Sequence, residues 1–220
     1  MTTDLDHRAT AFSETVRLAT LDDHRAAEGT PFVAALLAGE LPVEEYGRFL
    51  GQLWFVYDAL ERAGDALASD PVVAPFLFEE LRRAPALAAD LTVVVGADWR
   101  SSIAPLPATR AYADRLVDVG RTWPGGYVAH HYTRSLGDLS GGRMIGRVVQ
   151  RTLGFDPRRG ASFYDFPGIA SPNRFKVDYR SLLDAAPWGS DERNRIVDEV
   201  RAAFRHNRAL FDDLEASRGG

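Results

Sequence analysis

The stretch HHYTRSLGDLSGGRMIGRVVQ, which runs from His130 to Gln150, carries the pattern that decides the fold. Apolar residues recur along it at the spacing of one face of an α-helix, so the stretch predicts a helix. Glycines nevertheless stand in its middle, although each glycine inside a helix costs about 1 kcal/mol relative to alanine. They are Gly137, Gly141, Gly142 and Gly146, and they surround a single acid, Asp138. The presence of four glycines in one helix therefore requires an explanation in packing or in function.

The composition excludes several classes of protein. Of the 220 residues, 45% are hydrophobic and 26% are charged, as in ordinary globular domains. The formal net charge of -5 gives no general attraction to nucleic acid or to an anionic membrane, and no apolar run is long enough to cross a bilayer. The lack of cysteine excludes disulfides, thiolate chemistry and cysteine-ligated metals. With the polar, acidic start MTTDLDHRAT, these features predict a cytoplasmic protein with one domain over residues 1–220.

Helical periodicity continues along nearly the whole chain, and no segment shows the alternation of a strand. The fold class that this predicts is all-α, with roughly eight helices. Residues 155–170 are expected to be irregular. The expected helices are one that carries Leu5, Ala19 and His24, one between Thr30 as cap and Gly39, one that carries Tyr46 and Leu60, shorter ones over 71–84 and 86–95, one within 105–126, the glycine-bearing helix, one capped by Ser171, and one from Ser190 to about Ser217.

His24 is the first candidate for chemistry. Arg17, Leu21, His24 and Glu28 are spaced by four, three and four residues, so on one helix they share a face. The imidazole could ligate a metal through one ring nitrogen while Glu28 holds the other. Arg17 would lie about 10 Å away along the axis, which suits a flat anionic cofactor whose metal and acid groups lie apart. The alternative, which this pattern alone favours, is a partly exposed histidine with a salt-bridging neighbour.

Two more helices carry polar groups of interest. Lys176 and Arg180 are cations four residues apart that could clamp carboxylates, or could simply form a solvated helix face. Asn207 interrupts the apolar stripe of the last helix between Phe204 and Phe211. Because a buried amide needs hydrogen-bond partners, Asn207 either supports a polar pocket or makes a structural hydrogen bond.

The glycine cluster allows two interpretations. Gly137 and Gly141 lie one turn apart, and without β-carbons their face lets the backbone approach a flat partner closely. Close packing of two helices is the alternative, but packing alone does not account for Asp138 with Arg134 four residues before it. A polar pair beside bare backbone indicates a pocket that holds water over a ligand. Competing motifs are missing: the chain has no Glu-x-x-His pair, no G-x-S-x-G elbow and no phosphate-binding glycine loop.

The string AHHYTRSLGDLSGGRMIGRVVQRTLG resembles the signature helix of the heme oxygenases. LDDHRAAEGTPFVAALLAGELPVEEYGRFLGQLWFVYDALE resembles the proximal segment and following helix of that family. FYDFPGIASPNRFKVDYRSLLD and AAFRHNRALFDDLE resemble its loop with a basic helix and its last helix, so the likeness covers essentially the whole chain. The resemblance implies a single-domain, multi-helical heme-oxygenase-like fold in which heme is sandwiched between a proximal helix and a kinked distal helix.

The resemblance also implies roles for individual residues. His24 matches the proximal ligand of the heme iron, and Glu28 matches its hydrogen-bonding partner. Asp138 matches the distal carboxylate that organises water over bound oxygen, and Gly137 and Gly141 match the glycines against the heme face. The other matches are Arg134, Tyr57 and Asn207 in the wider polar network, Arg17, Lys176, Arg180 and Tyr132 near the heme propionates, and Phe204 as an aromatic that lines the pocket.

The implied reaction is the oxidative cleavage of heme b, which is both cofactor and substrate, by O2 to biliverdin, carbon monoxide and ferrous iron. Electrons would come from a separate donor such as a ferredoxin or a flavoprotein reductase, because the chain has no nicotinamide or flavin motif. A heme carrier with the same fold is one alternative. The fold-related thiamin-degrading enzymes are another, but they would need a nucleophilic cysteine.

The chain departs from the family pattern at two positions. Ser135 stands where many members have a tyrosine, which predicts a change in local packing. Leu21 stands where some members have a lysine, which predicts a thinner clamp on the propionates.

Overall fold

The computed structural model describes residues 10–218. Ten α-helices lie in this range, joined by short connections and a few 3-10 turns, and apart from isolated bridges at 156–160 these residues form no β-structure. The all-α prediction is therefore confirmed. The helices are α1 Phe12–Ala19, α2 Leu21–Glu28, α3 Pro31–Ala38, α4 Val43–Ala66, α5 Ala84–Val94, α6 Trp99–Ser102, α7 Pro107–Thr122, α8 Pro124–Leu153, α9 Pro172–Ala185 and α10 Ser190–Ala216.

The expected first helix is in fact two helices. Leu5 and Ala9 lie outside the described residues, and the described part breaks at Thr20 between α1 and α2. The Thr20 hydroxyl donates to the carbonyl of Val16 at 2.8 Å, a local bond that competes with the helical ladder and bends helices. His24 consequently belongs to a separate short helix, α2. The distance to Arg17 that was expected for one continuous helix therefore does not apply.

The helix expected over 71–84 is wrong. Two 3-10 turns, Ala74–Phe76 and Glu79–Leu81, occupy this segment. The Asp70 carboxylate accepts hydrogen bonds from the amides of Val72 and Val73 at 2.8 and 3.1 Å, and Pro75 has no amide to donate. Because the Asp70 side chain already satisfies these amides, the segment forms turns instead of an α-helix.

The expected capping residues have different outcomes. Ser171 caps α9 as predicted, because its hydroxyl accepts from the Arg174 amide at 3.3 Å. Thr30 stands before α3, but its hydroxyl donates back to the Ala27 carbonyl instead. Ser190 is the first residue of α10 and makes no side-chain cap.

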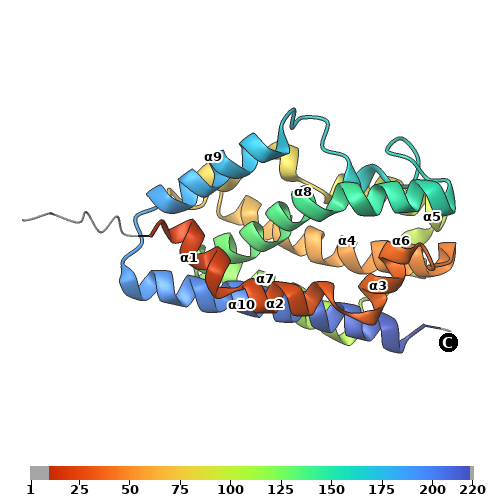
Figure 1. The fold of residues 1–220 in the computed structure, drawn as a ribbon, viewed down its shortest axis with the longest axis horizontal. Helices are drawn as coiled ribbons and strands as arrows, with labels where there is room; N and C mark the ends of the chain where they lie inside the picture. The colour runs from red at the N-terminus through yellow and green to blue at the C-terminus, as the bar shows by residue number, and fades with distance from the viewer. Residues whose placement is uncertain (1–9, 219–220) are drawn as a thin grey trace, which may run out of the picture.

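The long helices form a layered bundle around one core. The central helix α4 packs on α5 and α7, and α10 packs on α8, α7 and α2. In Figure 1, α10 runs along one edge beside α2 and α7, while α8 crosses above it and changes direction along its length. This arrangement leaves α2 and α8 facing each other across the bundle without close helix–helix contact.

The loop after α8 is anchored by buried polar groups. Asp90 on α5 is almost fully buried, and its carboxylate accepts from the Ser162 amide, the Ser162 hydroxyl and the Phe163 amide, each at 2.8 Å. The Tyr46 hydroxyl donates to the Gly160 carbonyl at 2.9 Å. These bonds hold Phe163 and Tyr164 against α8, because breaking them would leave buried donors unpaired.

A second buried polar cluster ties α7, α8 and α10 together. His130 Nε2 lies 2.8 Å from Glu199, and Arg115 donates to both Glu199 oxygens at 2.8 Å. Burial alone would raise the pKa of Glu199, but hydrogen bonds from His130 and Arg115 outweigh it and lower that pKa to about 2. His206 stacks on Tyr112 with ring centroids 4.9 Å apart. Burial, reinforced by His130 and Arg115, lowers the pKa of His206 to about 4.

We predict that the free energy of unfolding falls as pH drops from about 6.5 to about 4. The unfolded chain binds a proton on His206 in this window, whereas the folded chain holds the imidazole neutral until its lowered pKa is reached. His206→Phe keeps the ring stacked on Tyr112 but removes the titrating group, so its stability should depend less on pH. Urea unfolding at pH 7, 6 and 5 measures both slopes, and equal slopes would contradict the prediction.

Candidate functional site

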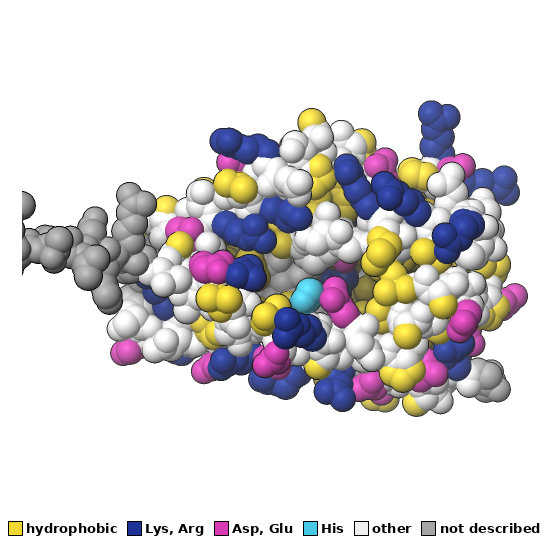
Figure 2. Space-filling view, in the orientation of Figure 1, with side chains coloured by type: hydrophobic (Ala, Val, Ile, Leu, Met, Phe, Trp, Pro, Cys, Tyr) yellow, Lys and Arg dark blue, Asp and Glu magenta, His cyan; other side chains and the backbone are white. Residues whose placement is uncertain are grey.

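A cavity separates α2 from α8. It consists of two adjoining hollows with volumes of about 230 and about 470 Å3, which is together the size of typical ligand pockets. Both hollows are lined by His24, Glu28, Gly137, Gly141 and Phe204. The space-filling view in Figure 2 shows this face of the molecule hollowed near its centre, next to a histidine and between basic side chains. The sequence placed these five residues in one site, and the structure brings them together.

The glycines of α8 divide into two pairs with different surroundings. A β-carbon added at Gly137 or Gly141 would meet no other atom within 4 Å, so both positions open onto the cavity. At Gly142 and Gly146, by contrast, an added β-carbon would lie 3.6 and 3.0 Å from Tyr164. The open-face interpretation thus fits Gly137 and Gly141, and the close-packing interpretation fits Gly146, whereas Gly142 has room for a β-carbon and also lines the cavity. Gly146, for which the sequence offered no function, is small because Tyr164 packs on it.

His24 faces the open glycines from α2. Its Nε2 atom lies 3.2 Å from a carboxylate oxygen of Glu28, one helical turn further on, and its ring packs edge-on against Phe204 with centroids 5.3 Å apart. The side chain is 42% exposed. Glu28 and Phe204 therefore orient the imidazole through one nitrogen and one face, and the other nitrogen remains for a ligand.

Asp138 lies on the α8 side of the cavity within a polar network. The Tyr57 hydroxyl, carried by α4, donates to one of its carboxylate oxygens. Arg134 lies 3.4 Å from both oxygens and donates to the Asn207 side-chain oxygen at 2.8 Å, while its guanidinium stacks over the Tyr57 ring at 5.1 Å. Burial raises the pKa of the Asp138 carboxyl well above its ordinary range. The network holds a carboxyl that can carry a proton beside the open backbone.

Basic groups line the outer end of the cavity. Arg17 and Arg180 lie there with the buried Tyr132. Arg17 is already held by Glu14, to which it donates at 2.8 and 2.6 Å, whereas the buried Nε of Arg180 has no partner among residues 10–218. Lys176 lies beside the cavity and donates to the hydroxyl of Ser140, a lining residue, at 3.2 Å. This end can receive an acidic group of a ligand.

Several lining residues were not predicted from the sequence. Thr133 and Met144 share the cavity face of α8 with Gly137 and Gly141. Thr133 lies four residues before Gly137, and Met144 lies three residues after Gly141, so helical spacing places them on that face. Helical spacing could have identified both. Phe163 and Tyr164 come from the irregular loop, where no periodicity indicates which side chains point inward. Their position depends on the bonds to Asp90 and cannot be read from local sequence.

The site is typical of a class of protein: a helical fold with room for a flat ligand between a histidine and a stretch of helix backbone without side chains. Residues present in the structure fit a metalloporphyrin. The glycine face leaves room that β-carbons would fill, a histidine with a free nitrogen lies opposite, and basic groups stand at one end. The buried Nε of Arg134 also lacks a partner within the described residues, next to Asp138.

Comparison with known proteins agrees with this fit. The family model "Heme oxygenase" matches residues 10–213. The heme oxygenase of Takifugu rubripes is 37% identical over 204 residues, which are 92% of this chain and 74% of that protein. The crystal structure of heme oxygenase-1 from the cyanobacterium Synechocystis in complex with heme superposes with a TM-score of 0.89 at 34% identity, covering 94% of this chain and 93% of the other. The chain belongs to the heme oxygenase family, which is a family of enzymes.

A more distant likeness concerns the fold alone. The TenA homologue from P. horikoshii superposes with a TM-score of 0.65 at 18% identity, covering 96% of this chain and 100% of the other.

The helices of residues 10–218 include none that is long and apolar enough to cross a membrane.

The two glycine pairs predict opposite responses to alanine. Gly137→Ala should raise the free energy of unfolding by about 0.5–1 kcal/mol, because alanine favours the helix and meets open space. Gly146→Ala should be less stable than Gly137→Ala by about 1 kcal/mol or more, because its β-carbon presses on Tyr164. Chemical denaturation of the two variants measures the difference, and equal stabilities would show that both glycines have the same surroundings.

Proposed function

We propose that the chain binds heme b in the cavity between α2 and α8 and cleaves it at a meso carbon to biliverdin, carbon monoxide and ferrous iron. The observation that carries the proposal is the open backbone at Gly137 and Gly141, with His24 on the opposite wall and Asp138 on the same helix. The heme complex of the Synechocystis relative supports it. We further propose that the reaction takes place in the cytoplasm.

The binding residues have distinct roles in this proposal. His24 would hold the heme iron, and Glu28 fixes the orientation of the His24 ring. Phe204 packs against that ring and against the ligand. Arg17, Arg180 and Tyr132 receive the propionates, with Lys176 beside them through Ser140. Arg17 already forms an ion pair with Glu14, and Leu21 carries no charge. Arg180 is therefore the principal cation that would bind the propionates.

Bound heme supplies the iron that activates O2 and the ring that is oxidised. Gly137 and Gly141 would allow the backbone of α8 to lie close to the bound ring. Asp138, with its raised pKa, can hold a proton and would deliver it, through water, to the cavity side of α8. Tyr57, Arg134 and Asn207 keep the carboxyl in place by hydrogen bonds.

Electrons must reach the site from another protein, such as a ferredoxin or a flavoprotein reductase. The sequence contains no nicotinamide or flavin motif. The basic side chains around the cavity in Figure 2 would attract an acidic donor to the exposed edge of the ligand.

The direct test is turnover by the purified chain. Hemin is added in air, followed by ascorbate or a ferredoxin system, and the absorption spectrum is recorded over time. Loss of the Soret band with growth of the biliverdin spectrum supports the proposal. A Soret band that persists in the presence of reductant and O2 would indicate a heme carrier instead.

We predict that His24→Ala loses turnover but keeps its fold. The variant lacks the axial ligand, while the half-exposed side chain contributes little to the core. Imidazole added to the variant should restore the spectrum of ligated heme, which a purely structural role of His24 would not explain. Circular dichroism checks the fold, and heme degradation at the normal rate without imidazole would refute the assignment of the ligand.

We predict that Asp138→Ala binds heme but forms at least tenfold less biliverdin, because the proton-carrying carboxyl is missing. Asp98→Ala is the matched control, since Asp98 is exposed and its side chain makes no cap to α6. Single-turnover spectra measure the biliverdin yield of both variants. An unchanged yield in Asp138→Ala would contradict its proton-delivery role.

A further inference from the structure

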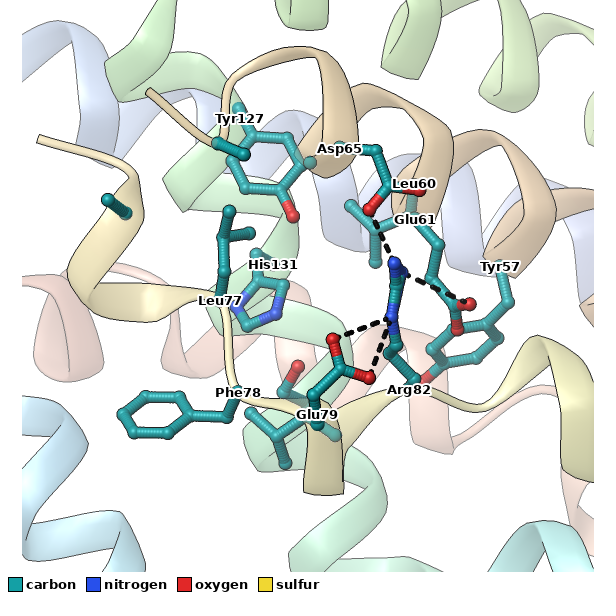
Figure 3. A pocket seen from close by; sticks show the side chains of 15 residues that line it. Tyr57, Leu60, Glu61, Asp65, Leu77, Phe78, Glu79, Arg82, Tyr127 and His131 are labelled. Carbon is teal, nitrogen blue, oxygen red and sulfur yellow. Dashed lines mark hydrogen bonds and ion pairs between the residues drawn. The ribbon is translucent and has the colours of Figure 1, made fainter. Parts of the chain in front are cut away.

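A second cavity, of about 280 Å3, lies between α4, the segment 68–82 and α8 (Figure 3). On α8 it is lined by Tyr127, His131 and Ser135, which are spaced by four residues and so form one stripe. This stripe is separate from the face that carries Gly137 and Gly141. Tyr57 links the two cavities, because it lines the second one while its hydroxyl donates to Asp138, which lines the first.

The Tyr127 hydroxyl points into this cavity, and within residues 10–218 it makes no hydrogen bond to another side chain or to the backbone. The side chain is 1% exposed, and none of the interactions drawn in Figure 3 involves its hydroxyl. A β-carbon at Gly64 would lie 2.4 Å from this oxygen, so glycine is required on α4 for the hydroxyl to reach the cavity. The hydroxyl is open to the cavity, so a water or a ligand there can hydrogen-bond to it.

His131 adds a second hydrogen-bonding group. Its Nδ1 atom lies 2.8 Å from the Tyr179 hydroxyl, and the other ring nitrogen faces the cavity in Figure 3. Burial lowers the pKa of His131 to about 4, so the imidazole is neutral at physiological pH. The inner end of the cavity therefore offers two uncharged groups that can hydrogen-bond to one ligand atom.

The rim of the cavity is acidic. Arg82 stands there between Asp65, Glu79 and Glu61, with Arg82 nitrogens 3.2 Å from Glu79 and 4.0 Å from Glu61. Three carboxylates around one guanidinium leave an excess of negative charge at the entrance. An anionic ligand would be repelled, whereas a neutral one would pass.

We propose that this cavity binds a small neutral aromatic alcohol, a molecule of one ring with a hydroxyl group. Its ring would pack against Leu60, Leu77 and the Tyr57 ring, and its hydroxyl would bond to Tyr127 and His131. The size agrees, because a cavity of about 150 Å3 suffices for benzene and drug-sized ligands fill about 300–1,000 Å3. Heme is far too large for this space.

The probe for the test is p-cresol, which is neutral at pH 7 because a phenol has a pKa of about 10. It is titrated by calorimetry into the heme-free and the heme-loaded chain, beside toluene, which lacks the hydroxyl, and 4-hydroxybenzoate, which adds a carboxylate. We expect saturable binding of p-cresol in both forms, with toluene about three- to tenfold weaker and 4-hydroxybenzoate weaker still. Absence of saturable p-cresol binding, or equal binding of 4-hydroxybenzoate, would overturn the proposal.

Variants assign the binding to this cavity. Ser135→Tyr places a large side chain into it and should abolish p-cresol binding, whereas Ser101→Tyr makes the same change at an exposed position of α6 and should have no effect. Tyr127→Phe keeps the ring and should weaken binding about three- to tenfold, which provides a test even if Ser135→Tyr does not fold. Unchanged binding in Tyr127→Phe would overturn the proposal. Each readout is independent of heme turnover, so failure here and failure of the proposed reaction are distinguishable.

Discussion

The structure depends on keeping one face of α8 free of side chains while the helix stays intact. Two glycines that touch nothing, Gly137 and Gly141, weaken the helix by about 1 kcal/mol each, and their neighbours must offset that loss. Gly146 contributes to this by admitting Tyr164 into close contact with the helix backbone. Packing on the other side of the same helix thus stabilises the helix that carries the open face.

Buried polar groups make this packing specific. Asp90 binds the loop that presents Tyr164, and Arg134 joins α8 to α10 through Asn207. Each group loses its hydrogen bonds to water on folding. It replaces them only if its protein partners are correctly placed. A shift of α8 along its axis would separate Arg134 from Asn207 on α10 and Asp138 from Tyr57 on α4. The polar network that serves the proposed chemistry therefore also fixes the register of the helix that carries the open face.

Local sequence was sufficient for some of these features and not for others. A period of 3.6 residues identified the all-α fold, and glycines around Asp138 identified the wall of the site, because both signals lie within one helix. The break at Thr20 and the turns over 71–84 depend on side-chain bonds to the backbone, which periodicity does not detect. The packing of Tyr164 on Gly146 joins distant segments, so only the folded chain reveals it.

Ser135 shows how a single departure from a family pattern acquires physical meaning. The sequence indicated a change in packing at this position, and the structure has a cavity there, lined by Ser135 and backed by Tyr57. Because the Tyr57 hydroxyl contacts Asp138, an occupant that displaced the Tyr57 ring would alter the hydrogen bonds of the carboxyl on the other side. A larger side chain at position 135 would instead hold that ring from behind. The smaller side chain of Ser135 leaves this cavity open beside Tyr57.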